Sequence, residues 1–266
     1  ISIAAVPVYA LQQGEIEVYP PNWWAGMQNP EVELMIYGED VADDAVSLAT
    51  GNVKVSRVKA LDSENYLFVT LDTSGAQAQD LVLTLTDNDE SQRTVHYSLE
   101  KRKEGSASRK GFGPEDAIYL IAPDRFANGN TANDNVDGYQ DKVDRQFKGG
   151  RHGGDIQGIV DNLDYVKSMG FTQIWTMPML ENAMDKYSYH GYSTTDYYRI
   201  DPRFGSNDAF IDFSEKAKSE GVGVIMDMVL NHIGSNHKWM EDTPSKDWIN
   251  NEGRFVGTTH KRESLH

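Results

Sequence analysis

The sequence predicts two folded domains of different class, an immunoglobulin-like β-sandwich followed by a parallel α/β domain. The first observation is a series of short apolar strands separated by turn residues from position 14 to position 100. The second is the polar, glycine-bearing stretch KRKEGSASRKGFGP at 101–114, which is typical of a linker. The third is an alternation of strand, loop and helix beyond it, which indicates a parallel sheet with covering helices.

The predicted strands of the sandwich are apolar runs bounded by turns such as DTSG at 72–75 and DNDE at 87–90. They lie at 15–19, 32–37, 66–71, 81–85 and 93–99. Trp23 and Trp24 are adjacent, and neighbouring strand residues point to opposite faces, so we expect at most one of them in the core. The other could face a partner or a ligand, although core and interdomain packing is the favoured interpretation.

The α/β part has predicted buried strands at 117–122, 172–178 and 222–230. Apolar residues at helical spacing predict a helix over 155–169, which Gly170 would end, and Ser206 would begin a second helix. Asp227 therefore falls near the carboxyl end of the third strand. In parallel sheets and barrels, ligands bind at these ends, so Asp227 is a candidate site residue. The structural alternative is a strand cap or a partner for a buried arginine.

Composition narrows the classes of partner. The 266 residues have a formal net charge of −16, which disfavours nucleic acid and anionic membranes. No cysteine is present, so disulfides and thiolate nucleophiles are excluded. The apolar start ISIAAVPVYA, residues 1–10, is similar to the remnant of a signal peptide and predicts a periplasmic or secreted protein; a first β-strand is the alternative.

Several motifs resemble the α-amylase family, glycoside hydrolase family 13. DMVLNH at 227–232 is similar to the family's first signature, and GFTQIWTMP at 170–178 to its second strand. YHGY at 189–192 and DYYRIDPRFG at 196–205 resemble the loop that follows that strand. PPNWWAGM at 20–27 resembles the start of the sandwich domain in the cyclomaltodextrinase, neopullulanase and maltogenic amylase branch.

The resemblance implies that the sandwich precedes the first part of a (β/α)8 TIM barrel. It also implies hydrolysis of α-1,4-glucosidic bonds in cyclomaltodextrins, maltooligosaccharides or pullulan by a retaining double displacement, which needs two carboxyl groups ~5 Å apart. In the family these groups follow later barrel strands, so we expect the nucleophile and the acid downstream of His266 and the 266-residue chain alone to be inactive. The expected domains are 1–10 (signal-peptide remnant), 11–104 (sandwich), 105–115 (linker), 116–233 (three βα units) and 234–266 (start of an inserted domain).

The resemblance also assigns substrate contacts. It implies that Tyr192 stacks on a pyranose ring, that His190 and His232 donate hydrogen bonds to sugar hydroxyls, and that Asn231 organises the loop. Such a pairing of aromatic faces with polar groups suits carbohydrate chemistry. Asp227 would support the site by pairing with an arginine near the nucleophile. The plain alternative for the loop is aromatic packing on the barrel.

The loop NGNTAND at 128–134 is rich in amide and carboxylate oxygens, the ligands that calcium prefers. The resemblance implies a Ca²⁺ site whose ligands are Asn128, Asn130, Asn133, Asp134, the Gly153 carbonyl and Asp155. An ordinary Asn/Gly turn is the alternative for the loop, and helix N-capping is the alternative for Asp155.

Other interpretations stay open on the sequence. A zinc site of His190, His232 and His237 is disfavoured, because no His-Glu-x-x-His motif is present. The chain could also be a non-catalytic α-glucan-binding module, or belong to a transglycosylase that uses the same donors. In the resembling branch the sandwich often contacts a second subunit, so a homodimer through the N-terminal domain is possible. The expected partner in every case is an α-glucan or cyclodextrin.

Overall fold

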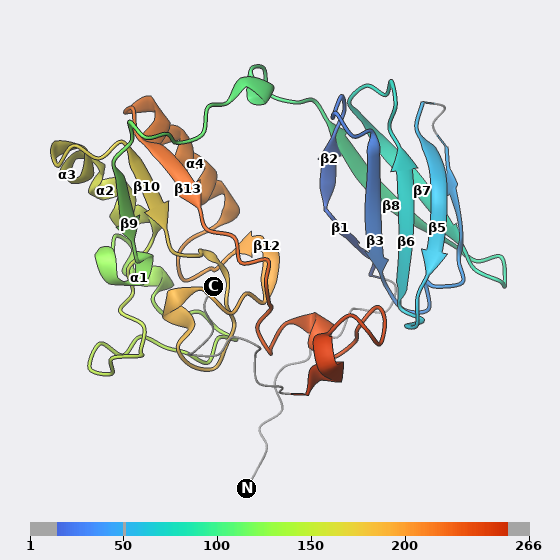
Figure 1. Ribbon diagram of the computed structural model, residues 1–266. Helices are drawn as coiled ribbons and strands as arrows, with labels where there is room; N and C mark the ends of the chain where they lie inside the picture. Colours follow the sequence, from blue (N-terminus) through green and yellow to red (C-terminus); the bar gives the residue numbers. More distant parts are fainter. Residues whose placement is uncertain (1–14, 50–51, 255–266) are drawn as a thin grey trace, which may run out of the picture. The chain divides into compact units, whose positions relative to one another are not determined.

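The computed structural model describes residues 15–49 and 52–254, which fold into two compact units (Figure 1). The first unit contains the described residues up to Ser108 together with 239–254, and the second contains 109–238. The division after Ser108 falls inside the predicted linker. The proposed signal-peptide remnant at 1–10 lies outside the described residues, so export stays a prediction. No helix in the described ranges has both the length and the apolar character needed to cross a bilayer.

The first unit is a β-sandwich of two four-stranded sheets (Figure 1). One sheet has the strand order β1-β3-β6-β5 and is antiparallel throughout. The other has the order β2-β8-β7-β4, in which β2 runs parallel to β8. The strands are β1 (Glu17–Tyr19), β2 (Asn22–Trp24), β3 (Glu31–Tyr37), β4 (Ala45–Leu48), β5 (Lys54–Ala60), β6 (Tyr66–Asp72), β7 (Gln79–Thr86) and β8 (Gln92–Glu100).

Alternation along the strands builds the sandwich core. Leu81, Leu83 and Leu85 of β7 are fully buried, whereas the residues between them are only half-buried. The five predicted strands are observed, and three shorter or more polar ones, β2, β4 and β5, were missed. Trp23 packs against the core while Trp24 is 37% exposed, in agreement with the expected opposite orientations.

The second unit has a three-stranded parallel sheet of order β13-β10-β9, with helices packed on one face (Figure 1). The strands are β9 (Ile118–Ile121), β10 (Gln173–Thr176) and β13 (Gly223–Met226). The helices are α1 (Pro123–Phe126), α2 (Ile156–Asp161), α3 (Leu163–Ser168) and α4 (Asn207–Ser219). The short strands β11 (Leu180–Glu181) and β12 (Asp196–Ile200) form a separate antiparallel pair.

Two sequence predictions need correction. The single helix predicted over 155–169 is broken into α2 and α3 at Asn162, whose backbone has φ −114° and ψ 17°. The Asn162 amide donates to the Gly158 carbonyl at 2.8 Å, and such local side-chain bonding competes with regular helix geometry. The third strand ends at Met226 instead of residue 230, because the chain beyond it leaves the sheet and the Val229 carbonyl accepts from the Tyr197 hydroxyl at 2.6 Å.

The two faces of the parallel sheet differ in burial. Ile174 on the helix side is fully buried, together with helix residues such as Ile159 and Phe213. On the other face Trp175 of β10 lies in register with Leu120 and Ile225, and Trp175 and Leu120 are 38% and 54% exposed. In a closed (β/α)8 barrel this face forms the packed interior.

The segment 239–248, defined here as the C-terminal segment, binds to the sandwich within the first unit. The Asp242 carboxylate accepts from the Ser63 hydroxyl at 3.0 Å and from the Asn65 amide at 2.8 Å. The Pro244 carbonyl accepts from two backbone amides at the β5–β6 connection, and the Trp248 ring lies 6.1 Å from that of Phe68. The predicted range 234–266 thus begins in the second unit and continues, from Trp239 onward, in the first.

Candidate functional site

Asp227 is held at the carboxyl end of the parallel sheet by donors from two other segments. It directly follows β13, and its Oδ2 accepts from the Tyr192 hydroxyl at 3.1 Å and from the indole Nε1 of Trp175 at 3.2 Å. Trp175 lies on β10, the strand that pairs with β13. Among the described residues, two neutral donors therefore stabilise this carboxylate. The carboxylate lies at the edge of the sheet where parallel sheets bind ligands.

Tyr192 is positioned by a tight turn after the 3₁₀ helix η3 (Ser188–His190). Gly191 has φ 77°, and a Cβ added there would lie 2.0 Å from the Pro178 carbonyl oxygen, so the turn requires glycine. The Tyr192 backbone amide donates to Nδ1 of His190 at 3.0 Å. Burial lowers the pKa of His190, which keeps the imidazole neutral and able to accept this bond at Nδ1.

His232, in the loop after β13, contacts the backbone of Tyr192. Its Nε2 lies 2.8 Å from the Tyr192 carbonyl oxygen, and its Nδ1 lies 3.2 Å from the Asn231 amide nitrogen. The tautomer consistent with both contacts donates from Nε2 and accepts at Nδ1. Donation to a sugar hydroxyl, the role expected from the sequence, requires His232 to exchange its bond to Tyr192 for one to the sugar.

The predicted substrate-binding residues thus come together instead of occupying separate pockets. Tyr192 contacts His190, His232 and Asp227, and Asn231 contacts His232. Burial, followed by the hydrogen bond to Asp227 and that residue's charge, raises the pKa of Tyr192. The phenol therefore stays protonated at neutral pH and continues to donate. Asn231 and His232 are exposed, so a ligand can reach them.

A buried ion pair that the sequence did not reveal supports the loops of this unit. Arg203 binds Asp201 in a two-point contact, Nε to Oδ1 at 2.9 Å and Nη2 to Oδ2 at 2.7 Å, and both side chains are at most 1% exposed. Arg203 also donates to the Asp141 and Asn182 carbonyls. Burial alone would raise the pKa of Asp201, but the hydrogen bonds and charge of Arg203 outweigh it, and the pKa is lowered.

The loop at 128–134 gathers oxygen atoms in the way its composition suggested. The Asn128 amide donates to Asp134 Oδ1 at 2.6 Å, and a Cβ on Gly153 would lie 2.6 Å from that same oxygen. The Oδ1 atoms of Asn128 and Asn133 are buried and have no hydrogen-bond partner. Buried acceptors without a partner are costly, so both atoms suit a bound cation.

Asp155 and Asn130 also perform capping roles, the alternative expected for Asp155. Asp155 is fully buried and accepts from the backbone amides of Gly129, Asn130 and Gly158, the last of which makes it the N-cap of α2. Asn130 caps the 3₁₀ helix η2 (Thr131–Asn133) through a bond from the Ala132 amide. Of the six predicted calcium ligands, Asn128, Asp134 and Gly153 lie together, whereas the side chains of Asn130 and Asp155 are engaged in capping.

The zinc alternative concerned His190, His232 and His237. Within residues 15–49 and 52–254, no group of three or more His, Asp or Glu side chains is arranged to hold a metal ion. The predicted calcium ligands are of a different kind, because their oxygens come mainly from amides and a backbone carbonyl.

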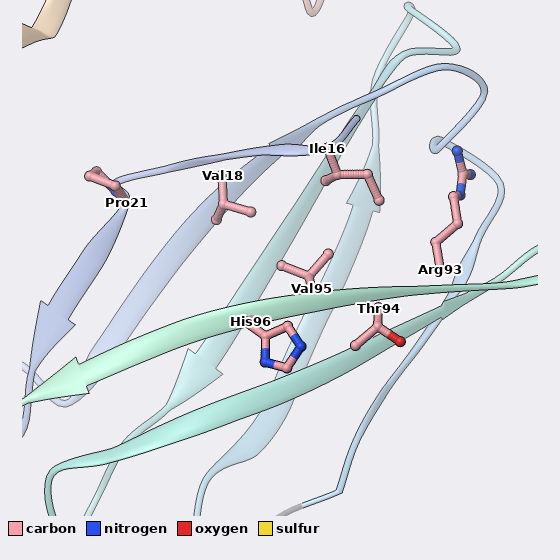
Figure 2. Close-up of a pocket in the computed structure, with 7 residues that line it drawn as sticks. All are labelled: Ile16, Val18, Pro21, Arg93, Thr94, Val95 and His96. Atoms are coloured by element: carbon pink, nitrogen blue, oxygen red, sulfur yellow. The ribbon is translucent and has the colours of Figure 1, made fainter. Parts of the chain in front are cut away.

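The sandwich has a surface pocket of about 400 Å³ that the sequence did not indicate. Figure 2 shows it between β1 and β8, where Ile16, Val18 and Val95 extend toward one another near His96. Arg93 at its margin binds Asp44 at 2.7 Å and the Glu39 carbonyl at 2.6 Å, so its charge is already neutralised. The predicted sugar contacts all lie in the other unit.

Comparison with known proteins identifies the family. Residues 120–263, more than half of the chain, match the model of the α-amylase catalytic domain. The chain belongs to the α-amylase family. Residues 17–103 match the model of the cyclomaltodextrinase N-terminal domain. The two units of this α-amylase family chain are therefore an N-terminal immunoglobulin-like sandwich and the first part of a (β/α)8 barrel.

Three curated relatives give the degree of similarity. A β/α-amylase of Paenibacillus polymyxa is 42% identical over 45% of this chain and 10% of its own length. A cyclomaltodextrinase of Thermoanaerobacter pseudethanolicus is 38% identical over 50% of this chain and 24% of its own length. Neopullulanase 2 of Thermoactinomyces vulgaris is 35% identical over 50% of this chain and 22% of its own length. The chain thus matches a quarter or less of each of these relatives.

Proposed function

We propose that this chain supplies the α-glucan-binding part of a glycoside hydrolase that cleaves α-1,4-glucosidic bonds. The observation that supports the proposal is the contact of Tyr192 with both His232 and Asp227 at the carboxyl ends of β10 and β13, in a chain of the α-amylase family. The Tyr192 ring lies 5.9 Å from the His190 ring, and the His232 imidazole contacts the Tyr192 backbone carbonyl. An aromatic face with such polar neighbours is what a pyranose ring needs.

In the proposed reaction, cyclomaltodextrins, maltooligosaccharides or pullulan are cleaved with retention of configuration. The nucleophile and the acid come from residues outside this sequence, and the residues present bind and orient the sugar. Hydrogen bonds from His190 and His232 contribute to the rate only to the extent that they strengthen in the transition state. A transglycosylase of the same family would use the same contacts and differ only in the acceptor.

We also propose that Ca²⁺ binds to the 128–134 loop. The unpartnered, buried oxygens of Asn128 and Asn133 support this, together with the proximity of Asp134 and Gly153. When bound, the ion would fix the loop to the start of α2 through Asp155. Its role would be structural.

The experiment is a calorimetric titration of the 266-residue chain with maltoheptaose and β-cyclodextrin, with cellohexaose as a β-linked control. We expect saturable binding of the α-linked sugars, weakened about tenfold or more by Tyr192→Ala and unchanged by Tyr165→Ala, which truncates an exposed tyrosine of α3. Turnover is then sought in a longer chain that includes the later barrel strands.

The result separates the candidate functions. Binding without turnover in the longer chain would support the α-glucan-binding module, and transfer to sugar acceptors would support the transglycosylase. Equal binding of cellohexaose, or a Tyr192→Ala variant with unchanged affinity, would overturn the proposed site.

A further inference from the structure

Two exposed aromatic side chains lie together in the second unit outside the Tyr192 contacts. Phe147 and Tyr187 have ring centroids 5.7 Å apart and are 47% and 51% exposed. They come from loops that are 40 residues apart in the sequence, so their contact is made by the tertiary fold. Large apolar side chains grouped on a surface often mark a binding site.

The backbone around Tyr187 is held in place by several contacts. Tyr187 has φ 60°, a left-handed conformation that is uncommon for a bulky residue. The following residue, Ser188, is fixed by two bonds to Asp141 Oδ2, both 2.9 Å, and accepts from Arg151 Nη1 at 3.2 Å. A Cβ on Gly149 would lie 2.2 Å from the Tyr187 ring, so the ring rests against the backbone of that glycine.

The Phe147 side is equally constrained. The Asp144 carboxylate accepts from the Phe147 amide at 3.3 Å, and the Phe147 carbonyl accepts from the Gly150 amide at 3.0 Å. Arg125 donates to the Lys148 and Gly150 carbonyls at 3.1 and 2.8 Å. Both rings therefore extend from loops that are already ordered, which reduces the entropy lost when a ligand binds.

The position of the pair indicates its ligand. Tyr187 immediately precedes η3, whose last residue is His190, so one short, fixed segment joins the aromatic pair to the candidate sugar contacts. The exposed polar side chains Gln146, Lys148 and Lys186 are sequence neighbours of the two rings and can reach hydroxyl groups. Aromatic faces next to such donors suit the apolar faces and hydroxyl rims of neutral sugars.

We propose that Phe147 and Tyr187 form an additional α-glucan-binding site, the Phe147/Tyr187 platform, which binds a sugar residue of a chain that also occupies the His190/Tyr192 contacts. This inference rests on the proposed function and deepens it. It makes the length of the glucan a determinant of affinity, because a short ligand reaches one group of aromatics and a long ligand reaches both.

The test compares maltotriose and maltoheptaose by calorimetric titration of the whole 266-residue chain. Tyr187→Asn removes the ring and retains a residue that tolerates the left-handed backbone, and Phe147→Ala removes the other ring. The matched control is Tyr165→Ala, because Tyr165 is also 51% exposed and lies on α3. We expect each platform variant to weaken maltoheptaose binding about threefold to tenfold and to leave maltotriose binding within twofold.

Circular dichroism and urea unfolding of each variant test whether the fold is retained. If Tyr187→Asn unfolds, Phe147→Ala still tests the platform. Unchanged maltoheptaose affinity in a folded platform variant, with weakening by Tyr192→Ala, would overturn the platform and leave the proposed function intact. Equal weakening by Tyr165→Ala, or equal loss for both glucans, would also overturn the platform. Absence of any α-glucan binding by the unmodified chain would overturn both.

Discussion

The hydroxyl of Tyr192 donates to Oδ2 of Asp227 across 3.1 Å, and this bond joins the loop after the second parallel strand to the end of the third. Tyr192→Phe removes the bond and keeps the ring. Because the acceptor is a carboxylate and the bond is partly buried, we expect the free energy of unfolding to fall by about 1–2 kcal/mol, measured by urea unfolding. Since the ring is the proposed sugar contact, maltoheptaose affinity should stay within about threefold.

The comparison with Tyr192→Ala separates the two roles of this side chain. If Tyr192→Phe weakens glucan binding as much as Tyr192→Ala does, the hydroxyl and not the ring is the group that the sugar requires. That outcome would contradict the stacking interpretation while leaving the location of the site unchanged.

The Asp201–Arg203 pair has a large predicted effect on stability. Asp201→Asn leaves the Arg203 guanidinium buried without its counter-charge, and we expect a loss of about 3–5 kcal/mol in unfolding free energy. The surface pair Arg57–Glu33 is the control, since its side chains are 63% and 45% exposed. Glu33→Gln should cost no more than about 1 kcal/mol. Similar losses in the two variants would show that the buried pair is not what stabilises these loops.

Local periodicity predicted most of the fold, because it records which face of each strand or helix is buried. The strand with Leu81, Leu83 and Leu85 is an example. Periodicity failed where a strand is mostly exposed and interrupted by a bulge, as in β5, and where a side chain redirects the backbone, as at Asn162. Dimerisation through the sandwich stays a prediction.

The candidate site was predictable for a different reason. Asp227 directly follows one of two neighbouring parallel strands, and His190, Tyr192 and His232 lie in the loops that follow these strands. All four residues therefore come from segments that leave the same edge of the sheet. The sequence did not predict the Asp201–Arg203 ion pair or the Phe147–Tyr187 contact, because loop conformation determines which side chains meet there. Asp201 and Arg203 are two residues apart in a turn, a spacing that has no periodic signal.

The effect of one substitution on stability should depend on calcium. Asn133→Ala removes a buried oxygen that has no hydrogen-bond partner, so in chelator we expect its unfolding free energy to stay within about 1 kcal/mol of the unmodified chain. In excess Ca²⁺ the unmodified chain should gain about 2–3 kcal/mol at a hundredfold excess over Kd, and the variant should gain much less. Thermal unfolding in chelator, Ca²⁺ and Mg²⁺ measures both effects.

Asn162→Ala is the matched control for this prediction. Its amide donates to the Gly158 carbonyl, so the variant should be destabilised equally with and without calcium. A chain whose unfolding temperature does not respond to Ca²⁺ would contradict the calcium site and favour the plain Asn/Gly turn.

The bond between Asn65 and Asp242 should be measurable as a coupling. A double-mutant cycle of Asn65→Ala and Asp242→Ala, followed by urea unfolding, should give an interaction free energy of about 1–2 kcal/mol, because the acceptor is charged and partly buried. The control is a second cycle that combines Asn65→Ala with Glu241→Ala, because Glu241 is the exposed sequence neighbour of Asp242. Its coupling to Asn65 should be clearly smaller; equal coupling in both cycles would contradict a specific role for Asp242.

His237 should make the stability of the second unit depend on pH. It is 3% exposed, and burial, assisted by the charge of Lys238, lowers its pKa from 6.5 to about 4. Between these values the unfolded chain binds a proton that the folded chain does not, so stability falls as the pH decreases. The contribution is fully present above pH 6.5 and is lost as the pH falls through about 4.

Urea unfolding at pH 7 and pH 5 measures this effect. The free energy of unfolding should decrease less between these pH values for His237→Gln than for the unmodified chain. A His237→Gln curve parallel to that of the unmodified chain would exclude His237 as the titrating group.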